Sequence, residues 1–102
     1  MPDTEIAKML VLSTAQLSFI DATAMESIID LQIDFPVGIY DKPDCGFFIN
    51  VPQDAGMQSV SGHHQMLPSL LKALIHARSL GCDWIMFDRD GAVTADLPSY
   101  DW

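Results

Sequence analysis

The sequence predicts an α+β fold: a two-layer sandwich in which two helices lie on one face of a mainly antiparallel sheet. Apolar runs typical of strands alternate with two stretches of helical spacing, in the order β-α-β-β-α-β, and an additional short strand follows. The short connection between the second and third strands favours a hairpin, which weighs against the alternative of a small parallel α/β sheet. Split β-α-β and ferredoxin-like folds pack such an order in this way.

The beginning of the chain predicts a strand and then a helix. The apolar run from Lys8 to Ser13 suits a strand that is covered on both faces. Ser18 can cap a helix because its hydroxyl can accept an N–H of the first turn, and Asp21 suits the positive end of the helix dipole. We therefore expect a helix over about residues 18–32. Its apolar spacing is carried by Ile20, Ala24, Ile28 and Leu31.

The middle of the chain predicts a hairpin and then a loop. Two β-rich runs, 37–40 and 47–51, flank a turn that contains Pro43 and Gly46. The stretch 53–65 is polar and contains two glycines, so we expect an exposed loop or a partly ordered connection there.

The last third predicts a second helix and the final strands. Pro68 can occupy the first turn of a helix without the loss of an internal hydrogen bond, and Gly81 can provide a left-handed stop, so the helix should span about 67–80. Its apolar side is predicted to consist of Leu67, Leu70, Leu71, Leu74 and Ala77. The apolar run 84–87 is the last strong strand, and 93–95 is the additional short strand that returns beside it.

Strand alternation predicts that both faces of the sheet are apolar. Phe47, Ile49 and Val51 fall on one side and Phe48 and Asn50 on the other, while Ile85 and Phe87 oppose Trp84 and Met86. If the helices cover the first set, the second set needs another cover. We expect this cover to be either the C-terminal segment 97–102 or a second subunit or partner, and homodimerisation is therefore open.

Length, composition and charge limit the classes of function. A chain of 102 residues fits one domain over 1–102. Fourteen acidic and five basic residues give a net charge of -9, which disfavours direct binding of nucleic acid and favours a basic protein partner. The apolar runs are shorter than the ~20 residues that cross a bilayer. Acidic residues stand where a secretory signal would carry basic ones. We expect a soluble cytoplasmic protein with no membrane association.

The residues that commonly bind metals form no recognisable motif. Cys45 and Cys82 are far apart and make no CxxC pair, so reduced thiols are expected. His63 and His64 fall in the predicted loop and His76 in the second helix, without an HExxH motif or a carboxylate at a similar spacing. We predict no bound metal and no other cofactor.

One short motif resembles a catalytic signature. The strand that runs into Asp88-x-Asp90-Gly91 is similar to the first motif of haloacid-dehalogenase-like phosphotransferases. The resemblance implies that Asp88 would be a nucleophile and Asp90 a general acid/base beside Mg²⁺. Ala92 replaces the threonine that usually follows the glycine, and too few residues follow to supply the family's later motifs. We interpret the motif as a tight turn and assign no catalytic residue.

A second resemblance extends over most of the chain. It is carried by Leu-Val-Leu-Ser-Thr-Ala near the start, Cys-Gly-Phe-Phe-Ile in the middle, and Gly-Cys-Asp-Trp-Ile-Met-Phe-Asp-Arg-Asp-Gly with Leu-Pro-Ser-Tyr-Asp-Trp near the end. These segments resemble an uncharacterised family of small acidic bacterial proteins found on plasmids and integrated elements, a domain of unknown function. The resemblance implies a cytoplasmic bacterial accessory protein and supplies no mechanism.

These observations favour a non-catalytic acidic interaction module that acts on a basic protein. A sharper version is an inhibitor whose carboxylates replace nucleic-acid phosphates at a basic site of a host protein. The candidate contact residues are Asp83, Asp88, Asp90, Asp96, Asp101, Trp84 and Trp102. The alternative is a metal-dependent enzyme or small-molecule binder centred on Asp88 and Asp90, completed by His63 or His64 of another chain.

Overall fold

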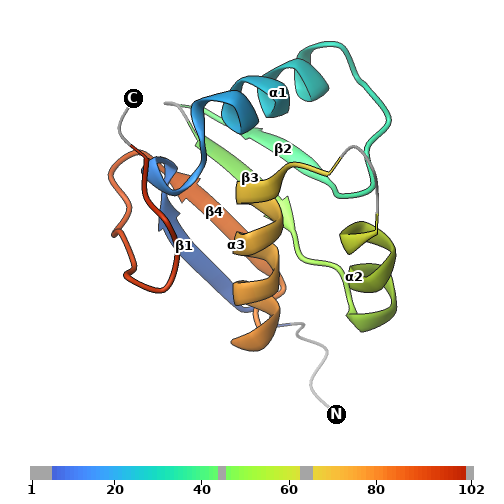
Figure 1. Cartoon of the computed structure of the whole chain (residues 1–102), viewed down its shortest axis with the longest axis vertical. Coiled ribbons are helices and arrows are strands. Elements are labelled where there is room, and N and C mark those ends of the chain that lie inside the picture. The colour runs from blue at the N-terminus through green and yellow to red at the C-terminus, as the bar shows by residue number, and fades with distance from the viewer. Residues whose placement is uncertain (1–5, 44–45, 63–65, 101–102) are drawn as a thin grey trace.

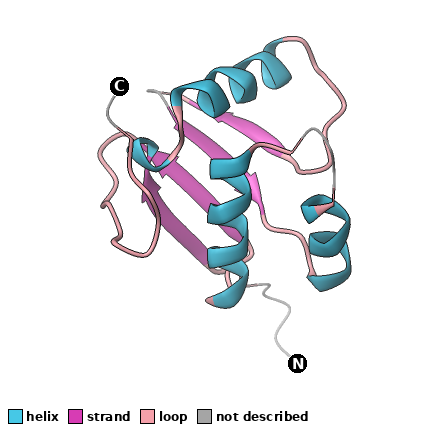
Figure 2. Ribbon diagram, viewed as in Figure 1, coloured by secondary structure: helices cyan, strands magenta, loops and turns pink. Residues whose placement is uncertain are grey.

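The computed structural model describes residues 6–43, 46–62 and 66–100, and within them one four-stranded sheet carries helices on one face (Figure 1). The strands are β1 (Met9–Ser13), β2 (Ile39–Lys42), β3 (Gly46–Asn50) and β4 (Trp84–Asp88). The helices are α1 (Phe19–Asp30), α2 (Asp54–Ser61) and α3 (Pro68–Ser79), and a 3-10 turn, η1 (Thr14–Gln16), follows β1. The predicted α+β class is confirmed, since α1 and α3 are the two main helices on the sheet (Figure 2).

The sheet is mixed and has the strand order β1-β4-β3-β2. β1 runs parallel to β4, whereas β3 runs antiparallel to both of its neighbours. It follows that β1 and β2 are parallel and that α1 connects them across the sheet. β3 and β4 are antiparallel neighbours, so the second half of the chain is not a β-α-β unit of the split or ferredoxin-like kind.

Two of the predicted elements differ from the structure. The stretch predicted as a loop contains α2, because Val60, only 2% exposed, and Met57 are apolar anchors within an otherwise polar sequence. The additional strand predicted at 93–95 is absent from the described chain. Ala92 accepts one hydrogen bond from the Ser13 N–H at 3.1 Å, but the following residues do not continue a ladder.

Helix α1 forms where it is predicted but faces the sheet with other residues. Ile20 is 78% exposed and Leu31 is 71% exposed, whereas Ala22 and Met25 are buried in the core. Asp21 is also buried, at 3% exposed. The spacing therefore predicted the helix correctly, but the residues that carry it are not its buried side, where Asp21, Ala22 and Met25 lie.

The Asp21 carboxylate joins the N-terminal ends of α1 and α3. The Ser69 N–H donates to Asp21 Oδ2 at 2.7 Å, and the Ser69 hydroxyl donates to the same oxygen. The Ser18 N–H donates to Ser69 Oγ at 3.1 Å, and Ser18 Oγ accepts the Asp21 N–H at 3.1 Å. Because the residue that precedes α3, Leu67, provides no side-chain cap, Asp21 serves as the cap of α3 from a different helix.

Helix α3 buries the side that the sequence predicts and ends at the predicted glycine. Gly81 has a φ of 73°, a conformation in which a side chain would be strained. The chain then turns into β4, whose inward residues continue the core. The buried apolar residues shared by the sheet and the main helices include Leu12, Met25, Phe47, Ile49, Leu70, Ala73, Leu74, Ala77, Ile85 and Phe87.

Replacement of Asp21 by alanine is expected to lower the free energy of unfolding by about 2 to 3 kcal/mol, because it leaves the buried Ser69 N–H and hydroxyl without an acceptor. Asp21→Asn should cost less, since one acceptor oxygen remains. Urea unfolding followed by circular dichroism measures both variants. Glu26→Ala removes an exposed carboxylate from the same helix and should change stability by less than about 0.5 kcal/mol. Equal effects at the two positions would contradict the capping role of Asp21.

Candidate functional site

The sheet face opposite the helices presents a continuous group of apolar side chains, which we call the open sheet face. It consists of Met9, Val11, Tyr40, Phe48, Trp84 and Met86. The strand register places Val11, Met86, Phe48 and Tyr40 in one row across all four strands. The exposed fractions of Met9, Val11 and Tyr40 are 42%, 44% and 54%, and the other three are half-buried. Strand alternation predicted the apolar character of this face correctly.

Aromatic rings give the open sheet face a shallow hollow. The rings of Tyr40 and Trp84 lie 6.0 Å apart between centroids, at an interplanar angle of 47°. The hollow has a volume of about 460 Å³. Its lining residues are Ala7, Met9, Tyr40, Phe48 and Trp84.

An ion pair closes one end of the open sheet face. Lys42 of β2 and Asp88 of β4 are both in register with Gly46 of the intervening strand, and the Lys42 Nζ lies 3.8 Å from Asp88 Oδ2. A Cβ at Gly46 would lie 2.9 Å from Lys42 Cδ and 2.2 Å from the Phe87 carbonyl oxygen. Glycine at this position therefore leaves room for the lysine to cross β3.

The described part of the C-terminal segment lies on the helix side of the molecule and not across the open sheet face. The buried Gln16 side chain donates to the carbonyl oxygens of Thr94 and Leu97, at 3.0 and 3.3 Å, and accepts the Thr94 N–H at 3.1 Å. Leu97 packs against the hydrophobic core, and the Tyr100 N–H donates to the Ala15 carbonyl oxygen at 2.7 Å. The segment thus runs beside β1 and η1 (Figure 1), and no described segment covers the open sheet face.

The predicted contact residues lie at several places in the fold. Asp83 precedes β4 and accepts the Lys8 N–H at 3.1 Å, whereas Asp88 ends the same strand. Asp90 is exposed in the following turn, and Asp96 lies on the helix side, with its Oδ2 3.8 Å from His76 Nε2. Among the candidates within residues 6–100, Trp84 belongs to the open sheet face and Asp88 borders it. Asp101 and Trp102 lie outside the described residues.

Hydrogen bonds within the turn after β4 connect Asp88 to Asp90 and Gly91. Asp88 Oδ1 accepts the Asp90 N–H at 3.1 Å, and the Gly91 N–H donates to the Asp88 carbonyl oxygen at 2.8 Å. A Cβ at Gly91 would lie 2.6 Å from the Leu12 carbonyl oxygen, so the turn packs tightly against β1. Over residues 6–43, 46–62 and 66–100, no group of three or more His, Cys, Asp and Glu side chains could hold a metal ion.

Of the other residues considered as metal ligands, His63, His64 and Cys45 lie outside the described residues. Cys82 is a buried free thiol.

None of the helices in the described parts of the chain is long and apolar enough to span a membrane.

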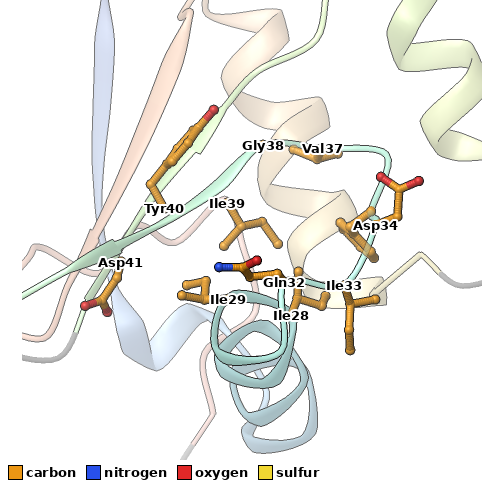
Figure 3. Close-up of a pocket in the computed structure, with 11 residues that line it drawn as sticks. Ile28, Ile29, Gln32, Ile33, Asp34, Val37, Gly38, Ile39, Tyr40 and Asp41 are labelled. Atoms are coloured by element: carbon orange, nitrogen blue, oxygen red, sulfur yellow. The ribbon is translucent and has the colours of Figure 1, made fainter.

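A second hollow, which sequence reasoning missed, lies between the end of α1 and β2, and we call it the α1–β2 groove (Figure 3). Its volume is about 670 Å³. Ile28, Ile29 and Ile33 contribute apolar side chains from α1 and the residues after it, and Ile39 faces them from β2. Tyr40 points to the other side of the strand in Figure 3. The sequence signal that could have indicated this groove is the set of isoleucines at the end of the predicted helix and in the following strand: Ile28, Ile29, Ile33 and Ile39.

Comparison with known proteins identifies a family. A family model described as "Family of unknown function (DUF5983) C-terminal domain" matches residues 9–102, nearly the whole chain. Neither the curated proteins nor the solved structures contain a match.

Replacement of Gln16 by leucine is expected to release the C-terminal segment, because the buried amide is bonded to backbone groups of Thr94 and Leu97. Hydrogen–deuterium exchange of residues 92–100 should accelerate at least about tenfold. A broken buried hydrogen bond costs about 1 to 3 kcal/mol, and a loss of ~1.4 kcal/mol in the stability of the segment corresponds to a factor of ten in its exchange rate. Gln58→Leu, at an exposed glutamine of α2, is the control. Unchanged exchange in the Gln16 variant would contradict the anchoring role.

Addition of Mg²⁺, Mn²⁺, Ca²⁺ or Zn²⁺ is expected to leave the melting temperature unchanged, because the Asp88 carboxylate already accepts the Asp90 N–H and faces Lys42. A cation present at 100 times its dissociation constant would stabilise the fold by about 2.7 kcal/mol. Differential scanning fluorimetry provides the measurement. A stabilisation that disappears in Asp88→Asn would support the metal-dependent alternative instead.

Proposed function

We propose that this chain, which belongs to the DUF5983 family, is a non-catalytic interaction module that binds a basic protein through its open sheet face. The observation that carries the proposal is the group of six apolar side chains on a sheet face that no described segment covers. Large exposed apolar patches are uncommon on monomeric proteins and mark contact surfaces. Tyrosine, tryptophan and methionine are also enriched at protein interfaces.

The distribution of charge supports a basic partner. The whole chain has a formal net charge of -9. The lysine that borders the open sheet face is paired within the chain, since Lys42 Nζ lies 3.8 Å from Asp88 Oδ2. It therefore adds little free positive charge to this surface. An acidic protein attracts basic partners and accelerates their association.

The net charge also supports a basic partner over a second copy of the chain. Two copies that met through this face would bring two charges of -9 close together, and this repulsion opposes association. A homodimer is therefore the competing outcome, and light scattering distinguishes it from binding of a basic protein.

The finer form of the proposal is a bacterial accessory protein that acts in the cytoplasm. Its resemblance to acidic proteins of plasmids and integrated elements supports this setting. In such a setting the carboxylates of Asp88 and Asp90 would replace nucleic-acid phosphates at a basic site of a host protein and inhibit it, with Trp84 as an additional anchor. Further contacts are proposed at Asp83, Asp96, Asp101 and Trp102.

Substitutions on the open sheet face are expected to weaken binding without unfolding the protein. A basic partner captured from the native host at low salt is purified, and its dissociation constant is measured by calorimetry. Val11→Lys and Trp84→Ser should each raise this constant at least about tenfold, because interface anchors commonly contribute more than 1 kcal/mol. High salt should raise it further, since salt screens exposed charges. Circular dichroism confirms that the variants are folded.

Ile20→Ser is the matched control, because Ile20 is an exposed apolar residue on α1, on the opposite side of the sheet. It should leave the dissociation constant unchanged. Binding that is insensitive both to salt and to the face variants would contradict the proposal. A dimer in light scattering that Val11→Lys dissociates would assign the open sheet face to self-association instead.

A further inference from the structure

We propose that the α1–β2 groove binds an extended basic segment of a partner protein, which adds as a fifth strand to the free edge of β2. This inference goes beyond the proposed function, because it concerns a different surface from the open sheet face. The two proposals can therefore fail separately.

The backbone of β2 provides the first argument. β2 is the last strand in the order β1-β4-β3-β2. The Asn50 N–H donates to the Gly38 carbonyl oxygen at 3.0 Å, and the antiparallel register pairs Tyr40 with Phe48 two residues later. Bonded and non-bonded pairs alternate in an antiparallel ladder. The N–H and C=O groups of Ile39 and Asp41 therefore point away from β3, toward the outer edge.

These outward groups form a template for strand addition. Among the described residues, no hydrogen bond outside the β2–β3 ladder uses the backbone groups of Ile39 or Asp41. An unpaired edge with donors and acceptors in alternation pairs readily with another extended chain. Two residues on β2 can thus supply two N–H donors and two C=O acceptors to a ligand.

The side chains of the groove provide the second argument, because they suit a strand whose groove-facing side chains are apolar in the middle and basic at the two ends. Ile28, Ile33 and Ile39 line the groove, and they can receive every second side chain of an added strand. Asp34 and Asp41 are both exposed, and Figure 3 places them at opposite ends of the groove. A basic residue at either end of the ligand would therefore meet a carboxylate.

Charge in the surrounding chain strengthens this preference. The segment 9–41 contains five acidic residues and no Lys, Arg or His. Four of the acids are exposed: Glu26, Asp30, Asp34 and Asp41. α1 also ends at the groove with no basic residue in its last turn, so the negative end of its dipole is not offset by a side chain. An acidic or neutral strand would meet repulsion or gain little there.

The test uses a fluorescein-labelled peptide of eight residues, Lys-Thr-Val-Thr-Val-Thr-Lys-Thr, whose valines and lysines share one face, and measures binding by fluorescence anisotropy. A peptide with glutamate in place of lysine, or one with N-methyl groups on the backbone amides facing β2, should bind at least about tenfold more weakly, because strand addition needs both the charge and the backbone hydrogen bonds. N-methylation of the other set of amides should have little effect.

The protein variants separate local recognition from overall charge. Asp34→Asn with Asp41→Asn should weaken binding of the peptide at least about fivefold, since both carboxylates border the groove. Asp90→Asn with Asp96→Asn changes the net charge by the same amount at a distance from the groove and is the control. Equal loss in both double variants would overturn the proposal in favour of general electrostatic attraction.

Amide exchange measured by nuclear magnetic resonance locates the bound peptide. The Ile39 and Asp41 amides should become protected from exchange when the peptide binds, and Val11→Lys should leave this binding unchanged. Binding of the peptide without added protection of the Ile39 and Asp41 amides would overturn strand addition at β2. Loss of binding in Val11→Lys would also overturn it. The second result would place the ligand on the open sheet face and leave the proposed function intact.

Discussion

The two main helices depend on one buried carboxylate, Asp21. Its oxygen accepts both the N–H and the hydroxyl of Ser69, so a residue in the first turn of α1 caps α3. A buried carboxylate without partners would be costly, so Asp21 favours the meeting of the two helices at this point. This contact helps to hold α1 and α3 together on one side of the sheet and turns the side of α1 with Asp21, Ala22 and Met25 inward.

The position of the helices determines which surfaces remain open. With α1 and α3 on one face, a second anchor, Gln16, draws the C-terminal segment onto the same side, where Leu97 completes the core. Nothing in the described chain then covers Phe48, Trp84 and Met86. One apolar sheet face is thus used by the fold, and the described chain leaves the other uncovered, which is why we propose that face as a contact surface.

Local pattern predicted the elements whose apolar residues recur at regular spacing. Alternation placed Ile85 and Phe87 on one face and Trp84 and Met86 on the other, and the spacing of leucines predicted the buried side of α3. The orientation of α1 was missed because the partner of Asp21 lies 48 residues away, and the position of the C-terminal segment was missed because Gln16 binds it across 78 residues. Polar groups that act over such separations leave no periodic signal in the sequence.

The acidity of the chain has a further consequence at the edge of the sheet. Exposed edge strands invite pairing with identical copies, and many proteins oppose this with lysine at the edge. Here the Lys42 side chain lies at the open sheet face and pairs with Asp88, so it does not guard the edge of β2. Asp34 and Asp41 border this edge, and their carboxylates oppose pairing with a second copy. Two copies joined edge to edge would bring these carboxylates together. The charge that opposes self-pairing is the same charge that would favour the basic strand we propose, so one set of residues would serve both protection from aggregation and selection of a ligand.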